Sequence, residues 1–522
     1  MIRAGGQQGV LRGIRWMGVI LALICATAAP PAAAAAEPCV APPGAGEWPV
    51  YGHDVANTRT QPAAQGIGVA EAPRLELAWA FSTDSTGDGT GFESTPAVDG
   101  GCAFVGSAAG VVYALDTASG RVVWRRRLDV AKPGYGGALV GAPVVSGGSV
   151  ILLVNDDGAP YAVALDRSTG AIRWRSPQFV TRPAGVIQGY YTNASPIVAN
   201  GLVVAGYSAP EGDPHGVGGF ALIDARSGAI VKVTPTIPPV DEARGYAGGG
   251  MWSTPAYDPE TKYAYWGSGN PSSKQLEHPN TNAILKIDLD RARPTFGRII
   301  AAYKGNVDQY SRELQEVSQT PACAATDDPS VPYPLDDPAC GQLDLDFGSS
   351  ANLFTTSSGA KVVGDLQKSG VYHVVRAGDM SPVWTALVGL SCQACNAAST
   401  AFAGGSVLGV ATPGGTMFSI ARDDGALSWT APVGGGVHYH PTSVADGVAW
   451  TIDNAGALVG FDARGGRPLV HRLLAPDAGT TVFTGGSGGV ALAERTLFAA
   501  TGSNGLGVAP ATGWVFAYRP AG

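Results

Sequence analysis

An internal repeat constrains this chain more than any other feature. The segment 112–124 reads VYALDTASGRVVW, and the segment 162–174 reads AVALDRSTGAIRW in the same register. A third copy at 221–231 keeps Asp224 and Gly228 aligned with the Asp and Gly of the first two. Each copy predicts a strand, a polar turn from Asp to Gly, and a second strand that ends in a large residue packed between layers. Self-similarity of this kind indicates a repeat architecture.

Weaker copies of the hairpin continue towards the C-terminus. The turns fall near positions 116, 166, 224, 288, 376, 422 and 462, at spacings of 40 to 88 residues, which suit four-stranded blades with insertions. These are seven hairpins, and an eighth blade can be assembled from 514–518 and 75–81. A blade shared by the two chain ends closes the ring and removes exposed edge strands. The sequence therefore predicts an all-β fold, an eight-bladed β-propeller over residues 37–522.

Composition supports this fold class and narrows the partners. The chain has 74 Gly and 38 Pro but only 15% charged residues, which favours short strands and turns over long amphipathic helices. Its net charge is -8, and its longest basic run is 125–127. Nucleic acid is therefore not expected as a partner, and small neutral substrates are favoured. The sequence has no Gly-x-Gly-x-x-Gly motif between a predicted strand and a helix, so a nicotinamide cofactor has no support.

Residues 1–36 have the pattern of a secretory signal peptide. Basic residues precede an apolar stretch from 16 to 29, and small residues at 34–36 end it before Glu37. The apolar stretch is shorter than the ~20 residues that span a bilayer, so no membrane span is expected. A lipoprotein anchor at Cys25 is an alternative, although the bulky Ile24 precedes it. We expect a secreted or periplasmic protein.

The cysteines predict disulfides. After cleavage at 36 the chain keeps Cys39, Cys102, Cys323, Cys340, Cys392 and Cys395. An even number in an oxidising compartment favours pairing. If sequence neighbours pair, Cys323 bonds to Cys340 and Cys392 to Cys395, which leaves Cys39 for Cys102. Other connectivities stay open. The last two also match a redox or half-zinc motif, without a second motif to complete a metal site. No Cys-x-x-Cys-His is present, so no covalently attached c-type haem is expected.

From Trp48 onward the chain resembles the quinoprotein dehydrogenases that use pyrroloquinoline quinone (PQQ). Residues 48–59, WPVYGHDVANTR, are similar to the start of those propellers, and repeats of the ALDxx(T/S)GxxxW type cover essentially the whole mature chain. The resemblance implies PQQ and Ca²⁺ as cofactors. These repeats indicate the fold more strongly than the function, because scaffold proteins of outer-membrane assembly use them too.

The resemblance assigns roles to residues in two linked segments. The segment 248–259, GGGMWSTPAYDP, is similar to the one that supplies a tryptophan platform for the quinone, which places Trp252 in that role. In the segment 265–271, YWGSGNP, Asn270 then corresponds to a calcium ligand. Upstream, GYSAPE at 206–211 resembles the stretch in which a serine contacts the cofactor and a glutamate binds calcium, here Ser208 and Glu211.

Further positions follow from the same resemblance. Glu93, in the sequence ESTP, and Asn193 are expected at the cofactor. Asp346, in LDLDFG, occupies the place of the catalytic base that takes the alcohol proton, with Asp344 as its competitor. Lys368 corresponds to the basic residue that stabilises charge on the reduced quinone and is expected both to bind the cofactor and to act in catalysis. Gly348 stands where lanthanide-dependent relatives are expected to have an Asp, so calcium is the expected metal.

Two departures from the family pattern bear on function. Many relatives carry an adjacent Cys-Cys pair followed by an Arg after the first blade, and residues 128–144 contain neither. The chain therefore looks closer to polyvinyl-alcohol dehydrogenases, whose substrates need an open cleft. We expect oxidation of a small, secondary or polymeric alcohol with a separate electron acceptor such as a cytochrome c. The alternative is a cofactor-free scaffold propeller. His438 and His440 are interpreted as core or funnel residues, since two ligands alone do not make a metal site.

Overall fold

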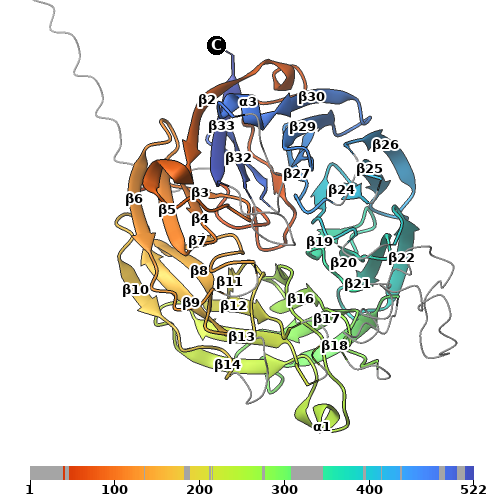
Figure 1. The fold of residues 1–522 in the computed structure, drawn as a ribbon. Coiled ribbons are helices and arrows are strands. Elements are labelled where there is room, and N and C mark those ends of the chain that lie inside the picture. Colours follow the sequence, from red (N-terminus) through yellow and green to blue (C-terminus); the bar gives the residue numbers. More distant parts are fainter. Residues whose placement is uncertain are drawn as a thin grey trace, which may run out of the picture. The chain divides into compact units, whose positions relative to one another are not determined.

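The computed structural model describes residues 39–41, 46–133, 136–181, 189–210, 213, 215–272, 277–306, 345–391, 395–412, 414–434, 438–480, 488–502 and 512–521. Within these residues the strands form eight sheets of four hydrogen-bonded strands each, one of which gains a fifth. The sheets are arranged around a centre, with the first strand of each near the centre and the last at the periphery (Figure 1). The predicted eight-bladed β-propeller is confirmed.

Blades 1 to 4 contain the following strands. Blade 1 has β3 (Ala97–Asp99), β4 (Cys102–Gly106), β5 (Val111–Asp116) and β6 (Val122–Arg127). Blade 2 has β7 (Val144–Ser146), β8 (Ser149–Asp156), β9 (Ala159–Asp166) and β10 (Ile172–Arg175). Blade 3 has β11 (Ile197–Ala199), β12 (Leu202–Tyr207), β13 (Gly219–Asp224) and β14 (Ile230–Pro235). Blade 4 has β15 (Ala256–Asp258), β16 (Tyr263–Gly267), β17 (Ala283–Asp288) and β18 (Ile299–Lys304).

Blades 5 to 8 complete the ring. Blade 5 has β19 (Asn352–Thr355), β20 (Lys361–Leu366), β21 (Val371–Arg376) and β22 (Pro382–Leu387). Blade 6 has β23 (Ala401–Ala403), β24 (Ser406–Ala411), β25 (Thr416–Ala421) and β26 (Leu427–Pro432). Blade 7 has β27 (Ser443–Ala445), β28 (Val448–Ile452), β29 (Ala457–Asp462) and β30 (Pro468–Leu473), with β1 (Thr60–Gln61) added in parallel to β27. Blade 8 has β31 (Val490–Ala493), β32 (Thr496–Thr501), β33 (Trp514–Pro520) and β2 (Leu75–Ser82).

Helical structure in the described residues is confined to single turns. They are η1 (Ala72–Arg74), η2 (Thr83–Thr86), α1 (Pro239–Glu242) and α3 (Leu474–Asp477). Among the residues that are described, no helix has the length and apolar character needed to cross a membrane.

The two chain ends meet in blade 8. Strand β2 pairs antiparallel with β33, in a register that runs from Leu75 opposite Pro520 to Ser82 opposite Trp514. The segments that the sequence analysis assigns to one blade therefore lie side by side in one sheet.

The repeated Asp-to-Gly turn connects neighbouring blades through its tryptophan. Trp124, at the large position of the first copy, donates a hydrogen bond from Nε1 to the carbonyl of Arg167 at 2.9 Å, in the turn of the next blade. Its ring lies against Gly170, where a Cβ would come within 2.5 Å of the indole. Gly170 also has φ of +68°, so glycine is required there for two reasons. The same bond is made by Trp79, Trp174, Trp384 and Trp429.

A lysine replaces the tryptophan between blades 3 and 4. Lys232 stands eight residues after Asp224, as Trp124 stands eight after Asp116. Its Nζ donates to the carbonyl of Phe296 at 2.6 Å, and its aliphatic chain lies against Gly297. The junction thus keeps its donor and its apolar contact while it loses the aromatic ring.

The N-terminal segment 46–61, called the strap here, runs past the innermost strands. Its residues make hydrogen bonds to the innermost strand of seven blades, and Val50 packs in the same apolar cluster as Ile197 of the remaining one, blade 3. The partners on the blades are Val98, Val145, Tyr257, Leu353, Phe402, Val444 and Leu492. One short segment therefore hydrogen-bonds to seven of the eight blades.

Arg59 anchors the end of the strap and is fully buried. Its guanidinium donates to the carbonyls of Thr442 and Tyr51 at 2.7 and 2.6 Å and to the hydroxyl of Ser443 at 2.8 Å. It also lies 4.5 Å above the ring of Tyr51, a cation–π distance. Burial lowers the pKa of Arg59 to about 10, so the group remains charged at neutral pH.

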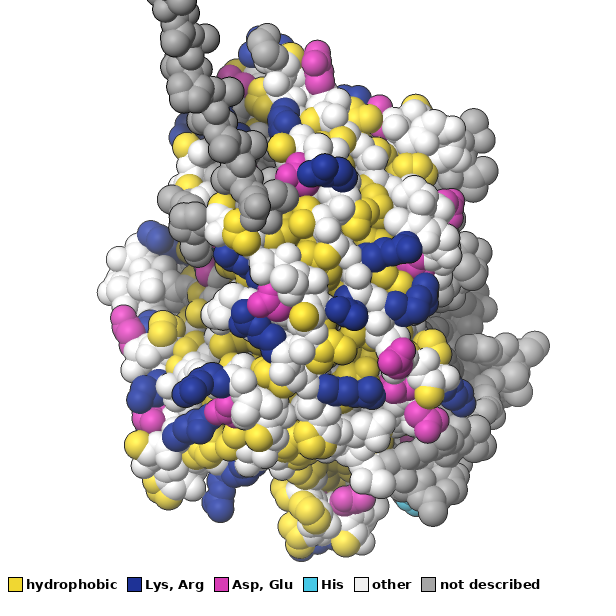
Figure 2. Space-filling view, turned by 90° about the vertical axis from the view of Figure 1, so that its left-hand side faces the viewer, with side chains coloured by type: hydrophobic (Ala, Val, Ile, Leu, Met, Phe, Trp, Pro, Cys, Tyr) yellow, Lys and Arg dark blue, Asp and Glu magenta, His cyan; other side chains and the backbone are white. Residues whose placement is uncertain are grey.

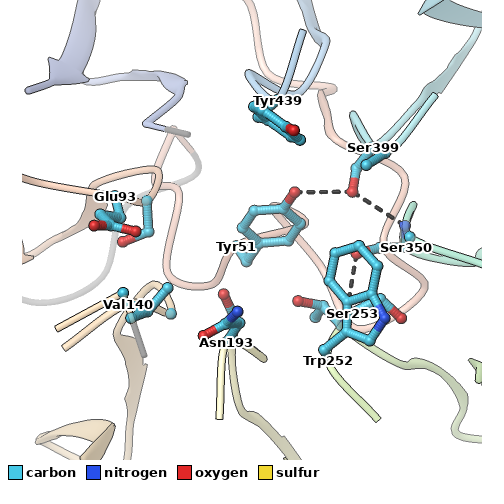
Figure 3. Close-up of a pocket in the computed structure, with 16 residues that line it drawn as sticks. Tyr51, Glu93, Val140, Asn193, Trp252, Ser253, Ser350, Ser399 and Tyr439 are labelled. Atoms are coloured by element: carbon cyan, nitrogen blue, oxygen red, sulfur yellow. Dashed lines mark hydrogen bonds between the residues drawn. The ribbon is translucent and has the colours of Figure 1, made fainter. Parts of the chain in front are cut away.

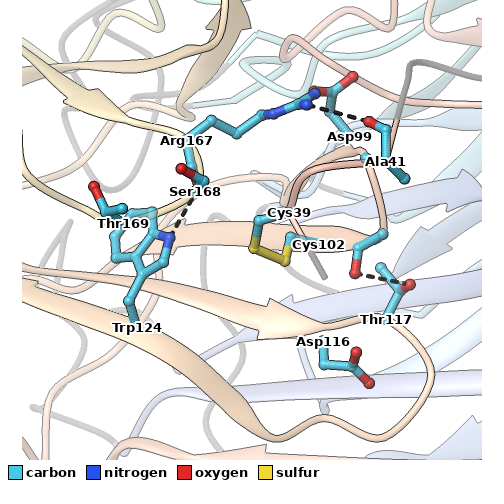
Figure 4. Close-up of a disulfide and its surroundings, with 12 residues drawn as sticks. Cys39, Ala41, Asp99, Cys102, Asp116, Thr117, Trp124, Arg167, Ser168 and Thr169 are labelled. Carbon is cyan, nitrogen blue, oxygen red and sulfur yellow. Dashed lines mark hydrogen bonds and ion pairs between the residues drawn. A yellow bond between two sulfur atoms is a disulfide. The ribbon is translucent and has the colours of Figure 1, made fainter. Parts of the chain in front are cut away.

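A disulfide fastens the segment at residue 39 to blade 1 (Figure 4). Cys39 is bonded to Cys102 of β4 across 63 residues of sequence, which confirms this pairing. Nearby, Arg167 of blade 2 pairs with Asp99 and donates to the carbonyl of Ala41 at 3.1 Å. Cys395 is also disulfide-bonded. Cys323, Cys340 and Cys392 lie outside the described residues.

The outer strands carry charges of both signs. Figure 2 shows Lys and Arg side chains scattered among acidic and hydrophobic ones on the face turned to the viewer. Several of the arginines on β6 and β10 are engaged locally. Arg173 pairs with Asp166 at 2.7 Å, Arg175 with Asp156 at 3.2 Å, and Arg125 donates to the carbonyl of Thr86.

Candidate functional site

A pocket lies between the strap and the inner ends of the blades (Figure 3). Three residues that the sequence analysis places at the cofactor contribute to its wall: Glu93, Asn193 and Trp252. The full lining is Tyr51, Glu93, Ser94, Gly136, Val140, Gly141, Asn193, Ser195, Trp252, Ser253, Thr254, Gly348, Ser350, Ala397, Ser399 and Tyr439. The strap and the segments that precede the innermost strands of seven blades, 1 to 7, therefore meet in one wall.

Trp252 is held by glycines on both sides. The run 248–250 passes so close to its neighbours that a Cβ at Gly250 would lie 2.6 Å from the hydroxyl of Ser208. On the other side, a Cβ at Gly348 would lie 2.5 Å from the indole of Trp252. Gly348 therefore allows the indole to approach the loop that carries Asp346, and Gly250 allows Ser208 to approach the segment that carries Trp252.

Asp346, Lys368 and Trp252 form one buried cluster. Nε1 of Trp252 donates to Oδ2 of Asp346 at 2.8 Å, and Nζ of Lys368 lies 2.7 Å from Oδ1 of the same carboxylate. Nζ of Lys368 is also 4.9 Å from the centre of the indole ring. Asp346 and Lys368 are 2% and 5% exposed. The carboxylate is therefore held from two sides, and the ammonium lies over the aromatic platform.

The backbone fixes this cluster as well. The amide of Lys368 donates to the carbonyl of Asp346 at 3.0 Å, which joins the turn after β20 to the loop before β19. The amide of Phe347 donates to the carbonyl of Ser268 at 3.3 Å, which ties the same loop to the segment that carries Asn270.

Asn270 and Ser208 adjoin the tryptophan from blades 4 and 3. The carbonyl of Asn270 accepts from the amide of Gly249 at 2.8 Å, so the two segments 248–259 and 265–271 are bonded to each other. Ser208 lies buried beside Gly250, and its hydroxyl makes no hydrogen bond within the described residues. The structure thus brings Ser208, Asn270, Asp346 and Lys368 around Trp252.

Glu93 and Asn193 approach one another on the opposite wall. A Cβ at Gly136 would lie 3.6 Å from Oε2 of Glu93 and 3.8 Å from Oδ1 of Asn193. In the part of the chain that is described, Oδ1 of Asn193 and Oγ of Ser253 are buried without a hydrogen-bond partner. Unsatisfied buried oxygens in a pocket wall are suited to receive hydrogen bonds from a bound molecule. Gly136, Val140 and Gly141 form the wall where many relatives carry their cysteine pair.

Two predicted site residues cannot be placed. Glu211, the expected calcium ligand, and Asp344, the competitor of Asp346, lie outside the described residues. Within the described ranges there is no group of three or more His, Cys, Asp or Glu side chains that could hold a metal ion.

Sequence reasoning missed the contribution of the strap. The hydroxyl of Tyr51 donates to Oγ of Ser399 at 2.8 Å, and the amide of Ser350 donates to the same atom at 3.1 Å. Figure 3 shows Tyr51 between Trp252, Asn193 and Tyr439. The signal that could have found Tyr51 is its place within 48–59, whose likeness to other propellers was used only for the fold.

The two histidines beside Tyr439 are core residues. His438 and His440 are both fully buried. Burial, and then the neighbouring His438, lower the pKa of His440 to about 3, so its ring is neutral at physiological pH. Burial also lowers the pKa of His438.

Comparison with known proteins gives a family. The PQQ_2 family model, described as outer membrane protein assembly factor BamB, matches residues 67–242 and 367–520. Among curated proteins, quinohemoprotein alcohol dehydrogenase ADH IIB of Pseudomonas putida is 30% identical over 50% of this chain and 39% of its own. Polyvinylalcohol dehydrogenase of Pseudomonas sp. is 25% identical over 65% of this chain and 50% of its own. The chain thus matches half or less of the length of these two relatives.

Solved structures share the fold. Quinohemoprotein alcohol dehydrogenase of Comamonas testosteroni superposes with a TM-score of 0.66 at 18% identity, over 90% of this chain and 80% of that one. A europium-containing methanol dehydrogenase gives 0.69 at 17%, over 91% and 98%. BamB of Moraxella catarrhalis gives 0.53 at 13%, over 85% and 99%. Two dehydrogenases and BamB are therefore all similar to this chain in fold, and the fold alone does not decide between their functions.

Proposed function

The chain belongs to the PQQ_2 family, and from that premise we propose that it is a quinoprotein dehydrogenase that oxidises an alcohol with PQQ. The observation that carries the proposal is the buried cluster of Trp252, Asp346 and Lys368. A buried ion pair is costly to desolvate and contributes little net stability. A scaffold propeller has no use for one beside a polar pocket, whereas a dehydrogenase needs a base there.

The residues present fit PQQ by their chemistry. The indole of Trp252 offers a flat apolar surface to a flat tricyclic molecule. Lys368 supplies a positive charge, and the unpaired oxygens of Asn193, Ser208 and Ser253 can bond to polar groups of a ligand. Glu93 adds an acidic group on the opposite wall. When bound, PQQ supplies the two-electron acceptor that these side chains lack.

The protein's own part in the reaction is proton transfer and orientation. Asp346 takes the hydroxyl proton of the alcohol on its carboxylate while the carbon-bound hydrogen leaves as hydride. The two hydrogen-bonding partners of Asp346 hold it in one orientation, which lowers the entropic cost of reaching the reactive geometry. Lys368 stabilises negative charge that develops on the acceptor, and burial makes that charge more effective.

Calcium is proposed as the metal, with Glu211 and Asn270 as protein ligands. Side-chain carboxylate and amide oxygens are the donors that this hard cation prefers. We further propose that electrons leave to a separate acceptor such as a cytochrome c, because the chain has no Cys-x-x-Cys-His. The likeness to a polyvinylalcohol dehydrogenase supports a secondary or polymeric alcohol as substrate. The pattern of residues 1–36 supports export.

Reconstitution tests the proposal. The purified protein is titrated with PQQ with and without CaCl₂, followed by absorbance, and then assayed for alcohol oxidation with a dye acceptor. We expect saturable binding that calcium strengthens, and dye reduction that requires both. Glu211→Gln should weaken binding at limiting calcium, and Asp213→Asn, a neighbouring loop acid, is the matched control. Absence of PQQ binding by the parent protein would favour the scaffold function that the family description suggests.

A further inference from the structure

A second carboxyl group lies behind the proposed base. Asp365 occupies β20, three residues before Lys368, and its side chain is fully buried. It packs on the end of β16, where a Cβ at Gly267 would lie 2.8 Å from Oδ2 of Asp365 and 2.6 Å from Cβ of Phe347. Asp365 therefore supports the residue that directly follows Asp346 in the chain.

No cation of the described residues neutralises Asp365. Neither of its carboxyl oxygens has a hydrogen-bond partner there. Lys368, the nearest lysine in sequence, is paired with Asp346. A buried carboxylate without a partner is strongly disfavoured relative to the protonated acid. Burial raises the pKa of Asp365 well above its usual range and outweighs the lowering effect of the Leu366 amide and the Ser349 hydroxyl, while the negative charge of Asp346 raises it further.

The other titratable groups around Asp365 are neutral. His373 lies opposite Asp365 in the pairing of β20 with β21, and burial lowers the pKa of its ring to about 4. Its nitrogens face the hydroxyl of Tyr303 and the side-chain oxygen of Gln367, each at 3.1 Å. The hydroxyl of Tyr372 donates to Asn352 at 3.1 Å. Asp346 is thus the charge that Asp365 experiences.

We propose that Asp365 is a positioning residue that keeps its own proton, so that Asp346 alone carries the negative charge of this carboxyl pair. An acceptor for that proton is Oγ of Ser349, which is buried without a hydrogen-bond partner in the described residues and lies close enough to affect the titration of Asp365. A bond from the acid to Ser349 would fasten the loop 345–350 to β20. The inference rests on the proposed role of Asp346 as the base.

Two variants separate protonation from packing. Asp365→Asn keeps the shape and a hydrogen-bond donor without any ionisable group, and Asp365→Leu removes the donor. In infrared difference spectra of the apoprotein, the wild type should show a protonated carboxyl band that Asp365→Asn lacks. Asp288→Asn is the matched control, because the fully buried Asp288 is paired with Arg293 at 3.2 Å and should instead lose a carboxylate band. A carboxylate band lost from Asp365→Asn would overturn the proposal.

Stability gives a second readout that needs no cofactor. A folded-state pKa above that of the unfolded chain, ~3.9, means that the native protein binds the proton more tightly, so its stability falls as pH rises above that value. Asp365→Asn lacks this effect. The unfolding temperature of Asp365→Asn minus that of the wild type should therefore increase from about pH 5 to about pH 8. A difference that shrinks with rising pH would contradict the assignment.

Crystal structures and kinetics test the positioning role. The contact between Asp346 and Lys368 should persist in Asp365→Asn and be displaced in Asp365→Leu, and turnover should fall by about tenfold or more only in the leucine variant. The acid limb of the kcat/KM profile should not move in Asp365→Asn, whereas a shift to lower pH would mean that a negative charge had been removed. If the wild type oxidised no alcohol, the proposed function would fail, and the apoprotein spectra, stabilities and structures would still decide on Asp365.

Discussion

Two buried cations near the centre of the ring are stabilised in different ways. Arg59 of the strap is surrounded by carbonyl and hydroxyl oxygens and by the ring of Tyr51, and within the described residues no carboxylate is bonded to it. Lys368 faces a carboxylate and an indole beside a pocket. Neutral dipoles hold a charge permanently without creating a reactive group. A carboxylate that pairs with a cation next to a pocket can also accept a proton, so the second arrangement is suited to chemistry and the first to structure.

The largest effect is expected when the proposed base, Asp346, is replaced. Asp346→Asn keeps the shape and can still accept from Trp252, but it cannot take the alcohol proton. Turnover should fall by about 10² to 10⁴, as is typical for loss of a general base, while PQQ affinity changes little. Asp344→Asn is the control. If the Asp344 variant lost activity and the Asp346 variant did not, the base would be Asp344, and if neither did, this loop would have no catalytic part.

A second substitution removes the buried cation of the strap, Arg59. Arg59→Met leaves two carbonyls and two hydroxyls without their donor in a fully buried place. Since each unsatisfied buried polar group costs about 1–3 kcal/mol, we expect the free energy of unfolding to fall by about 3–5 kcal/mol, measured with urea. Below the unfolding temperature kcat should be retained. Arg59→Lys should lose less, and a large loss of kcat with unchanged stability would reverse the roles of the two cations.

Acidification should weaken the strap end. His440 lies two residues before Thr442, a partner of Arg59, and its ring is neutral because its pKa is lowered to about 3. The unfolded chain has an ordinary histidine and binds a proton more readily, so stability falls as pH decreases from ~6.5 towards 3. Thermal unfolding across this range should be less pH-dependent in His440→Gln. An unchanged slope would mean that other groups govern the acid limb of stability.

The smallest effect is expected where the two regions meet. Tyr51 lies under Arg59 and also lines the pocket. Tyr51→Phe removes one hydrogen bond to Ser399 and should cost about 1 kcal/mol of stability, with kcat close to the parent value. Ser399→Ala also removes the acceptor of the Ser350 amide and should cost more, and the double variant should add little beyond Ser399→Ala. A strong loss of turnover would assign the Tyr51 hydroxyl to the chemistry.

The fold was predictable because its cause is local and repeated. Asp, Gly and a large residue at fixed spacing specify a turn and its contact with the next blade, so the copies at Trp124 and Trp174 identify the architecture. Lys232 shows where the pattern weakens, since the contact survives a change of residue that a repeat search overlooks. Short motifs singled out Trp252 and Asp346, which the structure brings into contact, and their roles in catalysis stay predictions. Tyr51 and Asp365 were not, because their neighbours are set by ring closure and strand pairing, and no local pattern marks them.

The strap has a consequence for the order in which the chain matures. It is translated before every blade, yet Arg59 finds its partners Thr442 and Ser443 only 383 and 384 residues later. Until blade 7 has been made, this arginine has no buried place to occupy, and the innermost strands have no common segment to join them. An early segment of the chain therefore depends on late ones, and its full set of contacts can form only after blades 7 and 8 have been made.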